Sequence, residues 1–295
     1  MGMRRVVSYI PSRKAVVFGF CFTILFAEGL AHLVIPGPNS YFQHSDDPEL
    51  VYQLRPGEYD AKSWVVPLPR SHVLVDPNGC RHVPFVGTGR SVLFLGDSVT
   101  FGFGVNDDEA LPAQFARLTG ARVFNCAVPG YGLDQYARNA EIRVPELKPD
   151  VIVVGLHAQD LVRSFDFSIL SENPLMQFRL ALLGVLVAYE FRSADREWHT
   201  AEEIENYLAR LRAAAGSTPL VLLETGSGVL HPSFRFDNAA GVQGLRIFKA
   251  GVYVQPDWVL ADDTHWTAKG GREIASLLLP WVNQVLPQPL TARVE

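Results

Sequence analysis

Short apolar runs alternate with longer amphipathic segments from residue 91 towards the end of the chain. Apolar runs of about four to eight residues are typical of strands that are buried on both faces of a parallel sheet. Helices that cover such a sheet account for the amphipathic segments between the runs. We therefore predict a three-layer α/β/α fold around a central parallel sheet of about five strands. The predicted strands are Ser91–Leu95, Arg122–Cys126, Val151–Gly155, Leu220–Glu224 and Gly251–Val254.

Capping and stop signals set the ends of the predicted helices. Asp107 or Asp108 is the expected N-cap of the first helix, and Gly120 is its stop. Thr267 is the expected N-cap of the last helix, and Pro280 is its stop because proline lacks the N–H that continues a helix. The helices are predicted at Glu109–Leu118, Leu133–Val144, Glu202–Ala214 and Ala268–Leu279.

A long insertion, residues 161–217, separates the third and fourth predicted strands. It contains the segment Leu175–Phe191, which is apolar on almost every side when it is drawn as a helix. A helix that is apolar all round is usually buried, so we expect this one to pack inside the protein. Two alternatives stay open: a lid or acyl-binding wall over an active site, and a helix that lies on a membrane surface.

The N-terminus has the pattern of an exported protein with a membrane segment. An uncharged run, Ala15–Ala27, is followed by Glu28 and by further apolar residues as far as Ile35, and Pro36-Gly37-Pro38 stops the segment. The basic residues that precede the run predict that the N-terminus stays in the cytoplasm and that the rest of the chain is exported. They are Arg4, Arg5, Arg13 and Lys14.

The length of this segment is compatible with either a cleaved signal peptide or a retained membrane anchor. Its uncharged part matches a signal-peptide core, whereas the run counted through Glu28 and His32 is about 20 residues long, enough to span a bilayer. Glu28 and His32 are one helical turn apart, near the membrane–water interface, where polar groups cost less. We favour an uncleaved signal anchor. A cleaved signal peptide, with a passable cleavage site at Gly29-Leu30-Ala31, is the alternative.

Residues 39–90 are rich in Pro, Gly, Asp and His and show no helical period. We predict an extended arm that packs on the main domain, with short strands at Ser63–Leu68 and His72–Val75 and a turn at Asp76-Pro77-Asn78-Gly79. The expected organisation is a cytoplasmic stub and signal anchor in residues 1–38, the arm in 39–90, the main domain in 91–285 and a tail in 286–295.

Composition narrows the functional classes. The chain has 295 residues, of which 48% are apolar, and this is ample for a full core. Its net charge of −5 argues against a general nucleic-acid-binding surface. Cys21, Cys80 and Cys126 do not make a disulfide framework, and Cys126 is expected to be a small core residue. A Cys80–Cys126 bridge is compatible with an oxidising compartment, but the sequence does not require it.

Ser98 follows the first predicted strand directly, in the sequence Gly96-Asp97-Ser98-Val99. Open α/β sheets carry their active sites at the carboxyl ends of parallel strands, so Ser98 is a candidate nucleophile. A serine hydroxyl needs a base within hydrogen-bonding reach, and that base needs an orienting carboxylate. The stretch Asp262-Asp263-Thr264-His265 offers His265 as the base and Asp262 as the orienting acid. Taken alone, this pair is better explained as a surface histidine and a turn former, because the chain has seven other histidines.

Acyl-transfer chemistry also needs hydrogen-bond donors for the negatively charged oxygen of the intermediate, the oxyanion. Three candidates follow the predicted strands: the backbone N–H groups of Ser98 and Gly130 and the side-chain amide of Gln159. Taken singly, Gly130 is compatible with a plain turn and Gln159 with an exposed loop. The sequence shows no second cluster of metal ligands and no phosphate-binding glycine loop, so we expect no metal and no cofactor.

Four of these segments occur in an order that resembles the SGNH, or GDSL-like, hydrolase family. They are Gly96-Asp97-Ser98-Val99, Gly130, the loop from Gly155 to Asp160, and Asp262-x-x-His265. The resemblance covers roughly residues 91–285 and implies the flavodoxin-like SGNH fold. It also implies that Ser98 is the nucleophile, His265 the base and Asp262 the orienting acid. Gly130 and the loop after the third strand would then supply oxyanion donors.

Two positions depart from the family pattern. Val99 stands where the family has leucine, which is a conservative difference. Gln159 stands where the family has asparagine, and the additional methylene displaces the amide by about 1.5 Å unless the loop adjusts. His157 in the same loop is an alternative donor, and Asp97 and Asp160 are further candidate residues of the site.

The resemblance implies a serine esterase that faces the periplasm or the cell exterior. The signal anchor, the arm and the sequence from Gly96 to Gly102 also resemble exported bacterial members, some of which act on acylated polysaccharides. We therefore expect a membrane-anchored enzyme that removes an O-acetyl or other short acyl group from a carbohydrate or related ester through an acyl-enzyme. The alternatives are an O-acyltransferase that acts on an exported polysaccharide and a non-catalytic carbohydrate-binding protein with the same fold.

Overall fold

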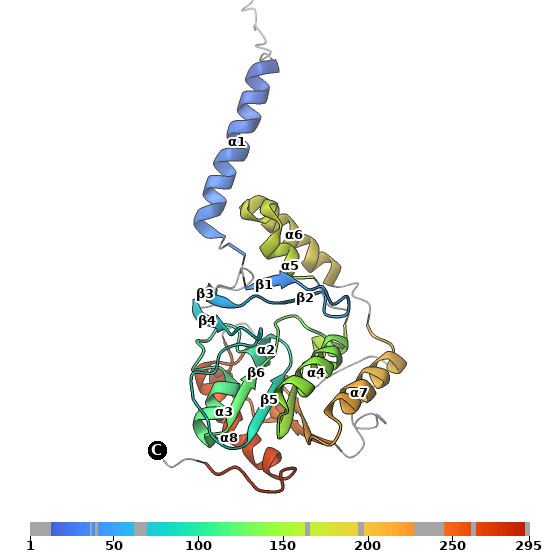
Figure 1. Ribbon diagram of the computed structural model, residues 1–295. Helices are drawn as coiled ribbons and strands as arrows, with labels where there is room; N and C mark the ends of the chain where they lie inside the picture. Colours follow the sequence, from blue (N-terminus) through green and yellow to red (C-terminus); the bar gives the residue numbers. More distant parts are fainter. Residues whose placement is uncertain are drawn as a thin grey trace, which may run out of the picture.

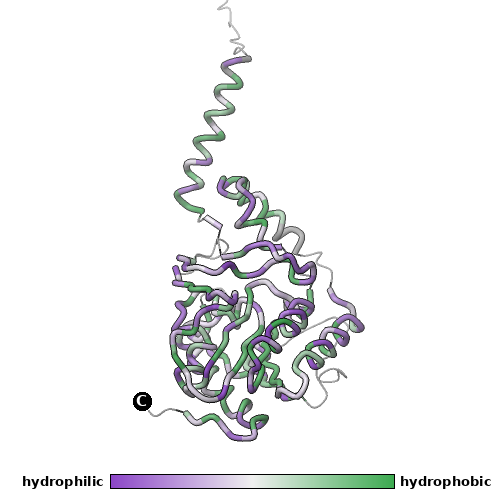
Figure 2. Tube along the Cα trace, viewed as in Figure 1, coloured by the Kyte–Doolittle hydropathy of each residue, from purple (hydrophilic) through white to green (hydrophobic). Residues whose placement is uncertain are grey.

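The computed structural model describes residues 13–35, 37–38, 41–61, 70–162, 166–193, 198–226, 245–260 and 264–292. A long helix, α1 (Arg13–Val34), extends away from an α/β body, and the strands of the arm lie between this helix and the body (Figure 1). Apolar residues dominate α1, whereas the helices of the body alternate between polar and apolar positions (Figure 2).

The body is built on a five-stranded parallel sheet with the strand order β6-β5-β7-β8-β9. The predicted α/β/α fold with a central parallel sheet is therefore confirmed. The strands are β5 (Ser91–Leu95), β6 (Arg122–Asn125), β7 (Val151–Leu156), β8 (Leu220–Glu224) and β9 (Arg246–Lys249).

Helices cover both faces of the sheet, because successive residues of a strand point to opposite sides. Leu93 and Leu95 of β5 pack with α4 and α7 on one face, and Val92 and Phe94 pack with α3 and α8 on the other. All residues of β5 and β7 are buried, which explains why these strands are continuous apolar runs. The helices are α3 (Leu111–Thr119), α4 (Leu133–Leu147), α7 (Ala201–Ala215) and α8 (Ala268–Asn283).

The prediction of the fifth strand at Gly251–Val254 is wrong. That segment lies in a 3-10 turn, η5 (Ala250–Val252), and in the loop after it, whereas β9 precedes it. β9 is an edge strand that pairs with β8 alone, so its side chains need not all be apolar. Phe248 is buried, while Arg246 and Lys249 are exposed. Because exposed polar residues flank the apolar ones, β9 does not stand out in the sequence as an apolar run.

The start of α3 also differs from the prediction. Ala110 is its N-cap and makes no side-chain capping bond, so neither Asp107 nor Asp108 caps this helix. Asp107 instead accepts hydrogen bonds from the arm, which the sequence pattern did not reveal. Gly120 ends the helix in the left-handed conformation with φ +66°, as predicted.

The last helix, α8, begins where the sequence predicts and ends later. Thr267 accepts a hydrogen bond from the Gly270 N–H and is the N-cap, as expected. Pro280 does not stop the helix, which continues to Asn283. Leu278 and Val282 are completely buried on either side of the proline, so packing on the sheet outweighs the one hydrogen bond that Pro280 cannot make.

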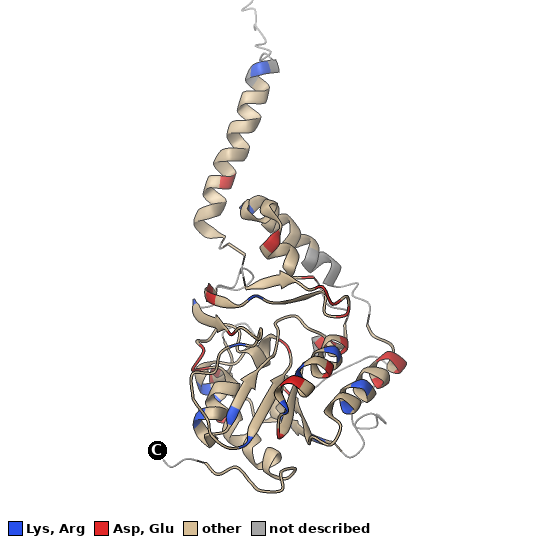
Figure 3. Cartoon of the chain, in the orientation of Figure 1, with Lys and Arg blue, Asp and Glu red and all other residues tan. Residues whose placement is uncertain are grey.

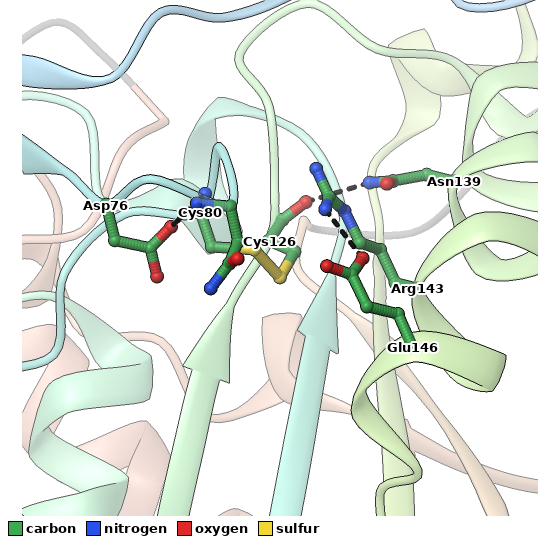
Figure 4. The surroundings of a disulfide bond; sticks show 7 residues. Asp76, Cys80, Cys126, Asn139, Arg143 and Glu146 are labelled. Atoms are coloured by element: carbon green, nitrogen blue, oxygen red, sulfur yellow. Dashed lines mark hydrogen bonds and ion pairs between the residues drawn. A yellow bond between two sulfur atoms is a disulfide. The ribbon is translucent and has the colours of Figure 1, made fainter.

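Two antiparallel strand pairs form the arm. Its strands are β1 (Phe42–His44), paired with β2 (Tyr52–Leu54), and β3 (Gly57–Ala61), paired with β4 (Ser71–Val75). The predicted strand at His72–Val75 is confirmed, and the one predicted at Ser63–Leu68 lies outside the described residues. A disulfide between Cys80 and Cys126 joins the arm to the loop after β6 (Figure 4).

A buried arginine from the arm, Arg81, forms a second connection to the body. Its Nε donates to Asp107 Oδ1 at 2.8 Å, and its two terminal nitrogens donate to the carbonyl oxygens of Phe101, Gly102 and Val105 at 3.0, 2.6 and 2.7 Å. Arg81 is 1% exposed. A charge at this depth is stable only because Asp107 and the carbonyl dipoles replace its water.

Helix α1 is exposed along almost its whole length. Among the described residues, Val16–Val34 is the segment long and apolar enough to cross a membrane, a test that N-terminal signal sequences also pass. Glu28 is its single Asp, Glu, Lys or Arg residue. Figure 3 accordingly shows α1 as uncharged apart from its basic start and one acidic position near its end.

The apolar part of the insertion does not form a fully buried helix. It forms η2 (Pro174–Gln177) and α6 (Arg179–Ser193), which follow α5 (Ser168–Glu172). Leu182 is buried, whereas Leu183 and Val187 are 42% and 44% exposed. In the described part of α6, residues 179–188, one side packs on the protein and the other is exposed, so the expectation of complete burial is wrong.

The disulfide predicts the number of reactive thiols. After denaturation, the full-length protein from an oxidising compartment should show one titratable thiol, that of Cys21, and three after reduction. Cys126→Ser should lower the free energy of unfolding by about 2–4 kcal/mol, since it opens a long covalent loop. Urea titration in detergent micelles measures this effect, with Cys21→Ser as the neutral control. Three thiols before reduction would contradict the bridge.

Arg81→Met should destabilise the protein by about 3–5 kcal/mol, because it removes the buried guanidinium that pairs with Asp107 and leaves carbonyl groups unsatisfied. The exposed pair Arg70–Asp60 provides the control, since Arg70→Met should cost less than about 1 kcal/mol. The same urea titration measures both variants. Equal effects of the two substitutions would show that the Arg81 network does not hold the arm.

Candidate active site

Ser98 lies at the first position of α2 (Ser98–Phe101), just beyond the carboxyl end of β5. Asp97 is the N-cap of this short helix, and its Oδ1 accepts the N–H groups of Val99 at 3.0 Å and Thr100 at 3.5 Å. Asp97 is buried, so these bonds hold the turn firmly. Ser98 itself stays half-buried at the surface of the turn.

The turn before Ser98 requires glycine. Gly96 has φ +150°, and a Cβ there would come within 2.5 Å of Thr100 Oγ1. Gly155, at the corresponding level of β7, lies even closer to Thr100, since a Cβ there would come within 1.8 Å of the same oxygen. The fully buried Thr100 therefore fills a space that only two glycines leave open, and this packing fixes the direction of α2.

His265 contacts Ser98, although the two residues are 167 positions apart in sequence. His265 Nε2 lies 2.7 Å from Ser98 Oγ. For Nε2 to accept the hydroxyl proton, Nδ1 must carry the other ring proton. The loop that holds His265 is fixed by a bridge between Val259 and Trp266 and by the bond from the Leu260 N–H to the His265 carbonyl at 2.8 Å.

The predicted orienting acid, Asp262, falls in residues 261–263, outside the described part of the chain. Its role therefore stays a prediction. The His265 ring lies against Phe103, with the ring centroids 5.2 Å apart. The sequence pattern does not mark Phe103 as part of the site.

The structure brings the Gly130 loop alongside the Ser98 turn. After β6, the N–H of Val128 donates to the Gly96 carbonyl at 2.9 Å, which continues the strand pairing into the loop. Gly130 has φ +81°, and a Cβ at this position would lie 2.3 Å from the Phe167 ring. Both the conformation and the space thus demand glycine here.

The third predicted segment follows β7 and forms a short 3-10 turn, η1 (Ala158–Leu161). Asp160 is buried, and its Oδ2 accepts the His157 N–H at 2.5 Å, so this carboxyl holds the turn together. The Gln159 side chain lies outside the described part of the structure, and the predicted donor role of Gln159 stays a prediction. His157 packs closely on Gly226, at the end of β8.

Asp97 and Asp160 interact electrostatically beneath the Ser98 turn. Burial and the charge of Asp97 raise the pKa of Asp160 well above its usual range, although the His157 N–H opposes this shift. Tyr136, completely buried beside them, has a raised pKa mainly because of burial and also because of both carboxyl groups. Each of the two carboxyl groups accepts backbone N–H groups of its own loop: Asp97 in the loop that carries Ser98, and Asp160 in the loop that carries His157. Both acids therefore stabilise the conformation of these loops.

The arm contributes to the site in a way that the sequence did not show. The Tyr52 hydroxyl donates to the Pro129 carbonyl at 3.0 Å, and the Tyr131 hydroxyl donates to the Tyr52 carbonyl at 2.5 Å. These two bonds connect the Gly130 loop to the arm. They join residues nearly 80 positions apart, and no local pattern marks Tyr52 as part of the site.

In the described ranges, no group of three or more His, Cys, Asp or Glu residues gathers in a way that could hold a metal ion. The chemistry that the described residues offer is that of a serine hydroxyl with an imidazole base at hydrogen-bonding distance. Glycine-containing loops surround this pair, as expected where a substrate approaches the backbone closely.

The comparison with family models identifies one family. The model of the GDSL-like Lipase/Acylhydrolase family matches residues 94–273. No curated protein sequence matches the chain. Solved structures with a similar fold include TesA, with 16% identity over 67% of this chain and 100% of that one and a TM-score of 0.45. A lipase/acylhydrolase from Enterococcus faecalis has 18% identity over 69% and 100% of the two chains and a TM-score of 0.44.

A third similar structure is the psychrotrophic esterase EstA from Pseudoalteromonas sp., with 12% identity over 66% of this chain and 97% of that one and a TM-score of 0.43. The family match covers well over half of the 295 residues and includes both Ser98 and His265. The chain therefore belongs to the GDSL-like lipase/acylhydrolase family of SGNH hydrolases and is an ester hydrolase.

Proposed function

We propose that the protein is a serine esterase that removes an O-acetyl or other short acyl group from a carbohydrate or a related ester. The contact of 2.7 Å between His265 Nε2 and Ser98 Oγ carries this proposal. It is the geometry that a base needs in order to take the serine proton during attack. The same contact argues against the alternative of a non-catalytic binding protein.

In the proposed mechanism, Ser98 Oγ attacks the ester carbonyl carbon while His265 Nε2 takes the hydroxyl proton. The backbone N–H groups of Ser98 and Gly130 and the amide of Gln159 stabilise the oxyanion, and Asp262 orients His265. The ester C–O bond then breaks, and His265 gives its proton to the leaving alcohol. Water attacks the acyl-enzyme in the same way, which releases the carboxylic acid and returns the proton to Ser98.

The surroundings of the catalytic pair support a small acyl group. The Phe103 ring lies against His265, and the Phe167 ring packs on Gly130. Both rings border the loops that would hold the acyl group, so they would offer it apolar contacts. The carbohydrate part of the proposal is supported by the resemblance to exported bacterial members that act on acylated polysaccharides.

We further propose that α1 anchors the protein and that the catalytic domain faces the periplasm or the cell exterior. The basic residues before the apolar helix support this orientation. The Cys80–Cys126 disulfide supports it independently, because such bonds persist mainly in oxidising compartments outside the cytoplasm.

Ser98→Ala should lower kcat for a chromogenic acetyl ester by at least about a thousandfold, because the nucleophile is lost. The full-length protein in detergent micelles should also react with a fluorophosphonate probe at Ser98, and the variant should not. Ser276→Ala, on the exposed side of α8, is the matched control and should keep full activity. Equal rates for Ser98→Ala and the unmodified protein would refute the esterase.

Gly130→Ala should reduce kcat by about a hundredfold or more, the loss expected when an oxyanion donor is displaced. The added Cβ meets the Phe167 ring, so Gly130→Ala combined with Phe167→Ala should recover part of the rate. Steady-state kinetics with the same acetyl ester measure both variants. If Gly130→Ala leaves kcat unchanged, the Gly130 N–H is not an oxyanion donor.

If the acyl-enzyme passes its acyl group to a sugar hydroxyl rather than to water, the protein is an O-acyltransferase. Adding an acceptor oligosaccharide to the assay separates the two outcomes, since a transferase yields acylated oligosaccharide and a hydrolase yields the free acid.

A further inference from the structure

Helix α6 is attached to α1 by its first residues. The Glu28 carboxylate accepts the backbone N–H groups of Arg179 at 2.5 Å and of Leu180 at 3.0 Å. In return, Arg179 Nε donates to the Ile35 carbonyl at 3.1 Å, just after the end of α1. Figure 1 shows α6 beside the end of α1 that faces the body. A residue of the apolar helix thus caps a helix of the catalytic domain.

This contact explains why an apolar helix carries a carboxylate. An acidic residue in a membrane helix is costly unless it is paired, and Glu28 is paired with the positive end of the α6 dipole and with His32, whose Nε2 lies 2.9 Å away. The alternative cleavage site, Gly29-Leu30-Ala31, lies after Glu28. Cleavage there would remove the cap, so the contact favours a retained α1.

The position of Glu28 places the start of α6 at the membrane boundary. Glu28 precedes Val34, the last residue of α1, by about 9 Å along the helix axis, at 1.5 Å per residue. Helices that lie on a membrane bury their apolar face about 5–10 Å into the boundary between headgroups and acyl chains. If α1 spans the bilayer, the first turn of α6 therefore lies at that depth.

At this depth the insertion presents an apolar surface that the protein leaves uncovered. We call it the exposed apolar face; its residues are Ile169, Leu175, Phe178, Leu180, Leu183 and Val187. Leu175 and Phe178 are 60% and 57% exposed. The opposite side of the same helices is well packed, since Leu170, Met176 and Leu182 are buried together. The exposed apolar face is thus part of an ordered unit.

We propose that the exposed apolar face docks on the lipid bilayer next to α1, so that α1, α5, η2 and α6 attach the enzyme to the outer surface of the membrane at two points. The occupant of the face is lipid, because the face continues the lipid-facing surface of α1 at the same level. This inference rests on the proposed anchor. A second copy of the chain is the competing occupant.

Docking has a consequence for the active site. Helix α5 packs on the arm, where the Ser171 hydroxyl donates to the Phe42 carbonyl at 2.7 Å. Phe167, the residue before α5, packs on Gly130. The docked helices therefore hold the side of the domain that carries Gly130 and Ser98 towards the membrane.

The test uses the full-length protein with Cys21→Ser, so that one introduced cysteine carries an environment-sensitive fluorophore. Leu183→Cys and Val187→Cys report on the exposed apolar face, and Ser276→Cys on α8 is the matched control. The variants are reconstituted in vesicles of phosphatidylcholine and phosphatidylglycerol, with or without a phospholipid that carries a quencher near its headgroup. Quenching at both positions of the face should exceed that at Ser276 by at least about twofold.

Quenching at the control level for both Leu183→Cys and Val187→Cys would overturn the proposal. Disulfide cross-linking of Leu183→Cys between two copies, without quenching by lipid, would also overturn it and would assign the face to a second copy. Glu28→Ala should reduce quenching at Leu183→Cys while the protein stays in the vesicles, since it releases the start of α6. Unchanged quenching in the Glu28→Ala variant would contradict the proposed role of Glu28 in holding α6 at the membrane.

Flotation of the vesicles after an alkaline carbonate wash separates this proposal from the anchor itself. Protein that leaves the vesicles contradicts the anchor, and the docking inference fails with it. Protein that floats while both labels on the exposed apolar face stay unquenched contradicts docking alone. Esterase activity is measured on the same samples, so a failure of the proposed chemistry is recognised independently of either result.

Discussion

The contact between Ser98 and His265 depends on close packing at one point of the central sheet. Gly96, directly after β5, and Gly155, on the neighbouring strand β7, leave a space that the Thr100 side chain fills, and this packing sets the direction in which α2 leaves β5. A side chain at either glycine would displace α2 and with it Ser98. The 2.7 Å distance between Ser98 Oγ and His265 Nε2 therefore depends on the absence of a side chain at both glycine positions.

The arm acts on the same region from outside the sheet. Arg81 binds the carbonyl groups of the segment that follows α2, and Tyr52 holds the Gly130 loop. The disulfide of Cys80 lies next to Arg81 in sequence and keeps it in place. Because Arg81 is fully buried with its charge, its ties to Asp107 and the carbonyl groups resist any movement of the arm. The arm is therefore part of the structure that shapes the candidate active site.

The helices of the insertion connect this active site to the N-terminal helix. Glu28 caps α6, α5 packs on the arm, and Phe167 packs on Gly130. These contacts form a continuous path of packed residues from α1 to the loops around Ser98. Attachment to a membrane would then fix the orientation of the catalytic domain, in addition to keeping the enzyme near the bilayer.

The sequence alone determined the parallel sheet, since buried strands must be apolar runs. It also determined the order of the segments around Ser98, since turns such as that at Gly96 need glycine. Tertiary structure decided the rest. An edge strand such as β9 needs few apolar residues, and the extension of α8 past Pro280 depends on packing against the sheet. The partners of Arg81 and Glu28 lie on distant segments, and only the fold brings each charged side chain and its partners together.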